Sequence, residues 1–153
     1  MKTDGRLSGV LHIMLHMAET KEVATSDALA KMMQTNPVVI RRVLAGLRKQ
    51  GFVSSEKGHG GGWRLSCDLS KVTLHDIYVA LGKPTILAIG NRSDISGCLV
   101  EKAVNTAMDQ AFCDAEELLL SRFRKVTLAE LREQLHRDFA HTTSLCNRTK
   151  RTK

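Results

Sequence analysis

The sequence predicts a mainly α-helical protein with a small β-hairpin wing: a winged helix-turn-helix plus a long dimerisation helix. Three observations predict this fold class. A basic helical pattern over residues 37–50 stops at a glycine. A glycine-rich run between two short strand-like segments follows it directly. A second, longer helical pattern covers residues 97–125, and a helix, a hairpin and a pairing helix in this order are typical of the fold.

The first two helices are expected within residues 6–33. Apolar residues recur at helical spacing from Arg6 to about Glu19, namely Leu7, Val10, Leu11, Met14, Leu15 and Ala18. Thr25 offers an N-cap for a short helix through about Met33. The inward side of this short helix is expected to hold Ala28, Leu29 and Met32.

The third helix begins after Asn36, with Pro37 in its first turn, where the missing N–H costs nothing. Its buried side is expected to hold Val39, Val43, Leu44 and Leu47. Gly51 fits the left-handed residue that ends many helices. Only a few residues separate this helix from the preceding one, as a helix-turn-helix requires.

The hairpin is predicted from two strand candidates, residues 52–53 and 63–65, on either side of a run that holds four glycines in residues 58–62. Glycine permits a positive φ and a close approach to a phosphate backbone. A nucleotide-binding phosphate loop is disfavoured, because the run lacks a Gly-Lys-Ser/Thr ending and precedes a strand. The hairpin therefore predicts the wing.

The remaining elements follow from caps and loop signals. A short helix is expected over residues 73–81, with Thr73 near its cap, and a connecting loop over 84–96. Thr127 and Glu130 form a capping-box pattern for a last helix through about Phe139. The predicted domains are residues 1–83, a DNA-binding winged helix-turn-helix, and 97–141, the dimerisation and C-terminal helices. Residues 142–153 are expected to form a basic flexible tail.

The long helix over residues 97–125 carries an apolar stripe. Its members are Val100, Ala103, Val104, Ala107, Ala111, Ala115, Leu118 and Leu119. A helix of this length cannot bury such a stripe on a small winged helix alone, so pairing with the same helix of a second subunit is expected. The alternative is an intramolecular cover over the domain.

The charge distribution favours a nucleic-acid partner. Residues 1–83 carry a net charge of +5, residues 84–143 carry −2 and the last ten carry +4. Between Asn36 and Arg64 there are six basic residues and one acid. A basic surface on the predicted helix and wing is what neutralisation of DNA phosphates requires. The alternative is a solvated basic face.

Composition excludes several other classes of protein. The chain has 153 residues, with 42% hydrophobic and 4% aromatic residues, enough for one domain with an appended helix. No apolar run approaches the roughly 20 residues of a membrane span, and no signal-peptide core is present, so a cytoplasmic protein is expected. No paired carboxylates or triad pattern appear, so no enzyme is expected. His12 and His16 lie one turn apart but lack a further ligand, so no metal site is expected.

The runs VVIRRVLAGLRKQGFVSSEKGHGGGWRL and TLHDIYVALG, with Cys-Leu before a long helix, resemble the Rrf2 family of bacterial transcription regulators over roughly residues 1–125. The resemblance implies a homodimer that binds a palindromic double-stranded DNA operator, usually as a repressor. Cluster-binding members carry three cysteines near the start of the long helix, and only Cys98 matches here. Cys113 lies about 22 Å further along a helix. One cysteine cannot supply four ligands, so the chain resembles the cluster-free branch and no iron–sulfur cluster is predicted.

The predicted DNA contacts lie on the third helix and the wing. They are Asn36, Val38, Arg41, Arg42, Lys57, His59 and Gly60. Arg48 and Lys49, at the far end of the helix, are expected to contact phosphates or only solvent. The two recognition helices of a dimer should lie about 34 Å apart, one turn of DNA. The alternative function is a winged-helix module that binds another protein without specific DNA binding.

The four cysteines, Cys67, Cys98, Cys113 and Cys146, include no CxxC pair and are expected to be reduced thiols. Cys98 lies where the long helix begins, with Lys102 one turn away, and both features stabilise a thiolate. We therefore expect a reversible thiol switch at Cys98 that responds to an oxidant or another small molecule. Cys113 could be its resolving partner only if it came from the other subunit. The alternative is that both cysteines are small buried apolar residues.

Overall fold

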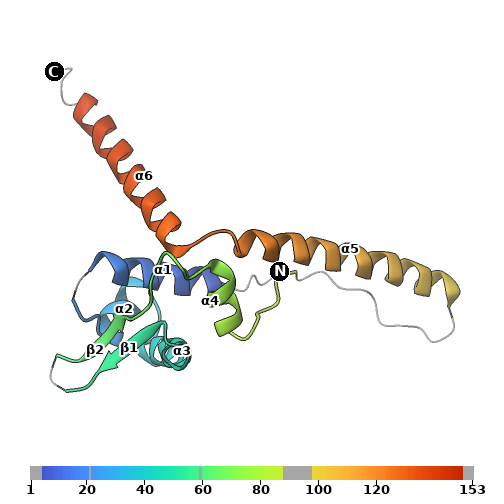
Figure 1. The fold of residues 1–153 in the computed structure, drawn as a ribbon, viewed down its shortest axis with the longest axis horizontal. Helices are drawn as coiled ribbons and strands as arrows, with labels where there is room; N and C mark the ends of the chain where they lie inside the picture. The colour runs from blue at the N-terminus through green and yellow to red at the C-terminus, as the bar shows by residue number, and fades with distance from the viewer. Residues whose placement is uncertain (1–4, 21, 59, 88–97, 150–153) are drawn as a thin grey trace.

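A two-stranded antiparallel hairpin lies among helices in the computed structural model, which describes residues 5–20, 22–58, 60–87 and 98–149, with side chains through residue 138. The elements in chain order are α1 (Arg6–Glu19), α2 (Ser26–Met32), α3 (Pro37–Lys49), β1 (Val53–Glu56), β2 (Gly62–Leu65), α4 (Leu74–Ala80), α5 (Leu99–Phe123) and α6 (Leu128–Thr149). Figure 1 shows α1–α4 and the hairpin gathered into one body, from which α5 and α6 project in different directions. The predicted fold class, mainly α with a hairpin wing, is confirmed.

Local hydrogen bonds fix the starts of the helices where the sequence predicts them. The Thr25 hydroxyl accepts from Ala28 N at 3.1 Å and caps α2. Thr73 and Asp76 form a capping box at α4, and Thr127 pairs in the same way with Glu130 at the start of α6. Each cap satisfies backbone N–H groups that a helix leaves without a partner in its first turn.

One apolar core joins α1 to α4 and the hairpin. The fully buried large side chains are Met14, Leu44, Leu47, Val53, Ile77 and Leu128. The prediction that Ala28, Met32 and Val39 face inward is wrong, because all three are exposed. Ala30 and Ile40 are buried instead. In both α2 and α3, the buried side is displaced by about one residue from the predicted side. The reason is that these helices pack against segments that are distant in sequence.

The start of α6 belongs to the same core. Leu128 is fully buried, and Leu128 N donates to Val72 O at 2.9 Å. Leu74 N donates to Val126 O at 3.0 Å, which joins the approaches to α4 and α6 into a short antiparallel bridge. The body is therefore completed by residues beyond the predicted boundary at 83.

Glu19 fastens α6 to α1 further along. Its carboxylate accepts from Arg132 Nε at 2.7 Å and lies 2.9 Å from His136 Nε2. The hydrogen bond from Arg132, followed by the contact with His136, holds the pKa of Glu19 below its usual range. The direction in which α6 leaves the body is set by this contact and by the bridge at Thr127.

The long helix α5 lies largely outside the body. None of its residues is buried, and Figure 1 shows it extending away from α1–α4 to a distant N-terminal end. Near its other end, the Phe123 ring meets Tyr78 of α4 edge to face at 6.3 Å. The alternative that α5 covers its own domain is therefore wrong.

Two further predictions meet the structure only in part. Residues 88–96 of the predicted loop lie outside the described residues, as does Gly97, whereas 84–87 are non-helical as expected. Helix α6 continues to Thr149, so the segment from 142 to 149 that was predicted as a flexible tail is helical. Among the described residues, no helix is long and apolar enough to span a membrane.

Candidate nucleic-acid interface

The helix pair α2–α3 presents α3 on the surface of the body. The turn between them includes Gln34 at φ +50°, and Thr35 N donates to Ala30 O at 2.9 Å. The buried side of α3 holds Ile40, Leu44 and Leu47. This packing leaves the opposite side of α3 exposed along its length.

The N-terminal half of α3 carries the predicted base-contacting residues. Val38 is 55% exposed, and Arg41 and Arg42 are also exposed. Asn36 Oδ1 accepts from Val38 N at 2.8 Å, so the carbonyl of this side chain caps α3. The amide nitrogen of Asn36 is a hydrogen-bond donor that takes no part in this cap.

Arg41 has a weak partner within the protein. Its Nη2 lies 3.9 Å from Asp27 Oδ2 on α2, and both side chains are more than half exposed. An exposed pair at this separation contributes little to stability. Arg42 has no ion pair among the described residues. Both guanidinium groups can therefore turn toward a phosphate or a guanine at small cost.

Arg48, at the far end of α3, is engaged with the wing. Its Nη1 donates to Ser55 Oγ at 2.8 Å, and its guanidinium carbon lies 6.0 Å from the centre of the Trp63 ring. From its sequence position, Arg48 was expected to contact DNA phosphates or only solvent. Its contacts with the wing were not predicted. Arg48 links β1, β2 and α3, so it orients the wing relative to the helix.

Trp63 anchors the wing to the helix-turn-helix from the inside. Its Nε1 donates to Ser26 Oγ at 2.9 Å, and both side chains are buried. The Trp63 backbone also exchanges two hydrogen bonds with Ala24, each 2.9 Å long. No sequence signal places these residues together, because 37 positions separate the two side chains.

The backbone conformation and the close packing of the wing explain why it contains four glycines. Gly58 and Gly60 have φ values of +100° and +82°, which L side chains rarely adopt. A Cβ on Gly61 would collide with the carbonyl oxygen of Glu56, and one on Gly62 would lie 2.6 Å from Ala24 O. The run therefore forms a tight tip and lets β2 approach the strand-like residues before α2.

The predicted wing contacts lie at this tip. Lys57 and Gly60 are exposed, whereas His59 lies outside the described residues. Figure 1 shows α3 and the hairpin on the side of the body opposite α6. We call the exposed residues of this side, Asn36, Val38, Arg41, Arg42, Lys57 and Gly60, the α3–wing surface. It combines a helix of the diameter that enters a major groove with a projecting basic hairpin.

Cys98 and Cys113 lie on α5, which projects from the body (Figure 1). Cys98 is the exposed N-cap residue of α5, without a side-chain capping hydrogen bond, and Cys113 is exposed on the same helix. The alternative that both are small buried apolar residues is therefore wrong. Burial raises the pKa of the half-buried Cys67 thiol. The side chain of Cys146 lies outside the described residues.

Potential metal ligands do not gather in the described part of the chain. His12 and His16 stack with ring centres 4.7 Å apart on α1, yet no group of three suitable side chains forms among the described residues. Cys98 and Cys113 are 15 positions apart on one helix, about 22 Å, so they cannot ligate one cluster. These residues do not fit an iron–sulfur cluster, which needs four ligands.

Comparisons with known proteins place this geometry in context. A family model described as Rrf2, iron-dependent transcriptional regulator, matches residues 3–134. YwnA of Bacillus subtilis, named as an HTH-type transcriptional regulator, is 26% identical over 132 residues, which cover 86% of this chain and 98% of YwnA.

Solved structures of regulators share the fold. A crystal structure of a transcriptional regulator from Lactobacillus plantarum has a TM-score of 0.70 at 24% identity, covering 97% of this chain and 99% of the other. IscR of T. potens has a TM-score of 0.64 at 19% identity, covering 88% of each chain. The resemblance in fold includes α5, because the coverage extends beyond the winged helix-turn-helix.

Proposed function

Because this chain belongs to the Rrf2 family of transcriptional regulators, we propose that it binds a palindromic double-stranded DNA operator as a homodimer and represses transcription. Members of this family are transcriptional regulators and not enzymes, in agreement with the lack of a catalytic pattern in the sequence. We propose that it acts in the cytoplasm, because the bacterial DNA that it would regulate lies there. A dimer bound over a promoter represses by excluding the polymerase.

The α3–wing surface is the observation that supports this proposal. Four basic or polar side chains of α3 face outward, Lys57 extends the charge to the wing tip, and Arg48 and Trp63 hold the wing against the helix. In this proposal Asn36, Val38, Arg41 and Arg42 meet base edges or adjacent phosphates in the major groove. Lys57, His59 and Gly60 reach the neighbouring groove or backbone.

Arg41→Ala tests the assignment. Arg41 carries only an exposed ion pair 3.9 Å long, so its removal should leave the fold intact. Loss of a bidentate contact with guanine should weaken operator binding by about 1–3 kcal/mol and leave binding to random DNA nearly unchanged. Arg137→Ala, an exposed arginine on α6, is the matched control and should change neither affinity. Equal loss on both DNAs would assign Arg41 to a phosphate.

The operator itself can be found by selecting genomic fragments with the purified protein. The salt dependence of binding distinguishes DNA binding from the alternative function, a module that binds another protein. DNA binding through several phosphates falls steeply and linearly with the logarithm of salt concentration. Selection that returns no enriched fragment, or binding with a flat salt response, would contradict the DNA-binding proposal.

We also propose that the chain acts without an iron–sulfur cluster. The thiols of Cys98 and Cys113 are too far apart on α5 to share a cluster, and no third ligand accompanies either among the described residues. A cluster would supply a redox- or iron-sensitive change of charge, which this donor set does not support. Anaerobic reconstitution with iron and sulfide should leave the visible absorption spectrum unchanged.

Cys98 is the proposed site of a thiol signal. It is the exposed N-cap residue of α5, so an oxidant in solution can reach its sulfur. Hydrogen peroxide would transfer one oxygen atom to the thiolate sulfur, giving a sulfenic acid and hydroxide as the O–O bond breaks. Operator binding should change after peroxide in the wild type and not in Cys98→Ser. An unchanged response in Cys98→Ser would remove Cys98 from this role.

A further inference from the structure

A carboxylate lies beside α3, next to one of the predicted base-contacting residues. Asp27 Oδ2 on α2 is 3.9 Å from Arg41 Nη2, and this is the only ion pair that α3 forms among the described residues. The Asp27 side chain is 75% exposed, so an approaching molecule can reach its charge. Such a group opposes the phosphates that the α3–wing surface is proposed to meet, because like charges repel each other.

The position of Asp27 is fixed by contacts of its neighbours. The Thr25 hydroxyl caps α2, and the buried Ser26 hydroxyl accepts from Trp63 Nε1 of the wing at 2.9 Å. Asp27 follows Ser26 in the first turn of α2, which packs against α3. The contact that anchors the wing therefore also holds the backbone of Asp27 beside Arg41.

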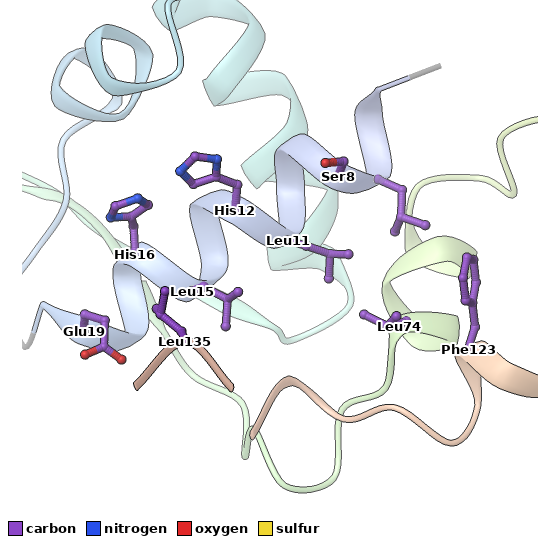
Figure 2. Close-up of a pocket in the computed structure, with 10 residues that line it drawn as sticks. Ser8, Leu11, His12, Leu15, His16, Glu19, Leu74, Phe123 and Leu135 are labelled. Carbon is purple, nitrogen blue, oxygen red and sulfur yellow. The ribbon is translucent and has the colours of Figure 1, made fainter. Parts of the chain in front are cut away.

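Glu19 is a second carboxylate paired with an arginine, but it faces another side of the body. It accepts from Arg132 Nε of α6 at 2.7 Å. Figure 2 shows Glu19 at the end of α1, on the lining of an apolar pocket that also includes Leu15 and Leu135. Helix α6 lies on the side of the body opposite α3 and the hairpin (Figure 1). Glu19 therefore provides a comparison for Asp27, because its ion pair lies away from the α3–wing surface.

Arg41 can meet DNA in two ways, and Asp27 affects them differently. A guanidinium carries five N–H donors in a planar fork, so Asp27 can stay at one edge while another edge faces outward. The outer edge can donate two hydrogen bonds to O6 and N7 of guanine, which are uncharged acceptors. It can also donate to a phosphate, whose negative charge then lies close to the Asp27 carboxylate. Repulsion between the two anions weakens the phosphate contact more than the guanine contact.

We propose that Asp27 is a specificity-determining residue, which keeps Arg41 for a guanine of the operator and weakens its contact with phosphates of other DNA. The proposal rests on the proposed function, DNA binding through the α3–wing surface, and names the base that Arg41 reads. Specificity is a difference between two affinities, so a group that weakens the unwanted complex raises it. The exposed pair adds little to stability, and its role is therefore in the choice of DNA.

The alternative is a purely structural role for Asp27. An acid in the first turn of a helix stabilises that helix through its dipole. If this were the whole role, removing the charge would loosen α2 and weaken binding to every DNA. The proposal predicts the opposite sign on random DNA, which should bind more tightly.

Asp27→Asn in the full chain keeps the shape of the side chain and removes its charge. Fluorescence anisotropy would measure its affinity for the selected operator and for a random duplex of the same length. Binding to random DNA should tighten by about threefold to tenfold. Its salt slope should steepen by about 0.9 for each Arg41 that gains a phosphate. Operator affinity should change much less, so the specificity ratio falls. Unchanged or weaker binding to random DNA would overturn the proposal.

Two further variants separate the place of the charge from the net charge. Glu19→Gln also removes one arginine-paired carboxylate, so it changes the net charge by the same amount. It should leave the specificity ratio as in the wild type. Asp27→Glu keeps the charge beside α3 and should also retain the ratio. An equal fall of the ratio in either variant would overturn the proposal.

The dependence on Arg41 is tested by a double-mutant cycle. In the Arg41→Ala background no guanidinium remains for a phosphate, so Asp27→Asn should no longer tighten binding to random DNA. The same tightening with and without Arg41 would mean that the carboxylate acts on DNA directly. That result would remove the positioning role proposed for Asp27.

The base that Arg41 reads is tested with operators in which each G·C pair is changed in turn to A·T. Arg41→Ala should lose discrimination at one G·C pair of each half-site. Asp27→Asn should weaken discrimination at the same pair, whereas Glu19→Gln should keep it. Full discrimination by Arg41→Ala at every G·C pair would overturn the assignment to guanine.

The same measurements distinguish this proposal from the proposed function. A wild-type protein that binds all DNA equally fails both together. A wild-type protein that prefers its operator, with the same preference in Asp27→Asn, fails this proposal alone. Circular dichroism and urea unfolding of each variant would show that the fold is kept, as expected for a side chain that is 75% exposed.

Discussion

Helices α3 and α5 both carry an apolar side at helical spacing, but only the apolar side of α3 is buried within the subunit. The apolar side of α3 is covered by α2, α4 and the hairpin, and Leu44 and Leu47 are fully buried. No residue of α5 is buried, and Val104 and Leu118 on its apolar side are at least half exposed. Periodicity shows which side of a helix is apolar, but it does not show whether the cover belongs to the same molecule.

The largest expected effect tests whether α6 belongs with the body. Leu128→Ala should lower the free energy of unfolding by about 2–5 kcal/mol, because it opens a cavity beside a fully buried site. Leu118→Ala on α5 should cost less than about 0.5 kcal/mol at concentrations where the chain is monomeric. Urea unfolding measures both. Similar losses would show that α5 is packed like the body and would remove the contrast.

The wing anchor gives a smaller effect. Trp63→Phe keeps most of the ring and deletes the N–H that donates to Ser26 Oγ at 2.9 Å. The unpaired buried hydroxyl should cost about 1–3 kcal/mol of unfolding free energy. Ser26→Ala in the same background should cost little more, so a double-mutant cycle would report coupling. Additive losses would mean that the hydrogen bond does not hold the wing.

Replacing Gly62 or Gly46 by alanine distinguishes a steric requirement of the tertiary structure from local helix propensity. Gly62→Ala should be destabilising by about 1–3 kcal/mol, because its Cβ would lie 2.6 Å from Ala24 O. Gly46→Ala on α3 meets no atom within 4 Å and should stabilise by about 0.5–1 kcal/mol through helix propensity. Thermal unfolding of the two variants provides the comparison. Stabilisation by both would contradict the close approach of β2 to Ala24.

The contact between α1 and α6 gives the smallest effect, and it depends on pH. The pKa of Glu19 is lowered by Arg132 and then His136, so its contribution to stability is present above the ordinary carboxyl value of 4.5. This contribution is lost as pH falls below that value through the folded-state pKa. Urea midpoints of the wild type and Glu19→Gln should differ near neutral pH and converge once the pH has fallen below the folded-state pKa of Glu19. A difference that grows on acidification would rule out the carboxylate as the stabilising form.

Much of the fold could be predicted because the signals are local. The starts of α2, α3, α4 and α6 follow from caps whose partners lie two or three residues away. Gly51 has the positive φ expected at a helix end. The basic residues of α3 and the wing tip lie on the surface, as predicted. Their contacts with DNA stay a prediction.

The errors share a cause. Ala28, Met32 and Val39 were expected inside, yet the orientation of α2 and α3 is set by Trp63, α1 and α4. The role of Arg48 depends on Ser55 and Trp63 across the hairpin. The alternative that Cys98 and Cys113 are buried fails because α5 has no cover within the described part of the subunit. Each of these outcomes needs a neighbour that composition and spacing do not locate.

The sequence by itself determined the ends of the helices, the glycine tip of the wing and the basic character of the α3–wing surface. The tertiary structure decided which residues are buried, that Leu128 completes the body, and that α5 leaves it uncovered. The physical reason is the distance along the chain over which each interaction is formed. A cap or a turn is satisfied within a few residues of chain, whereas burial requires a second surface that can lie 37 or more positions away.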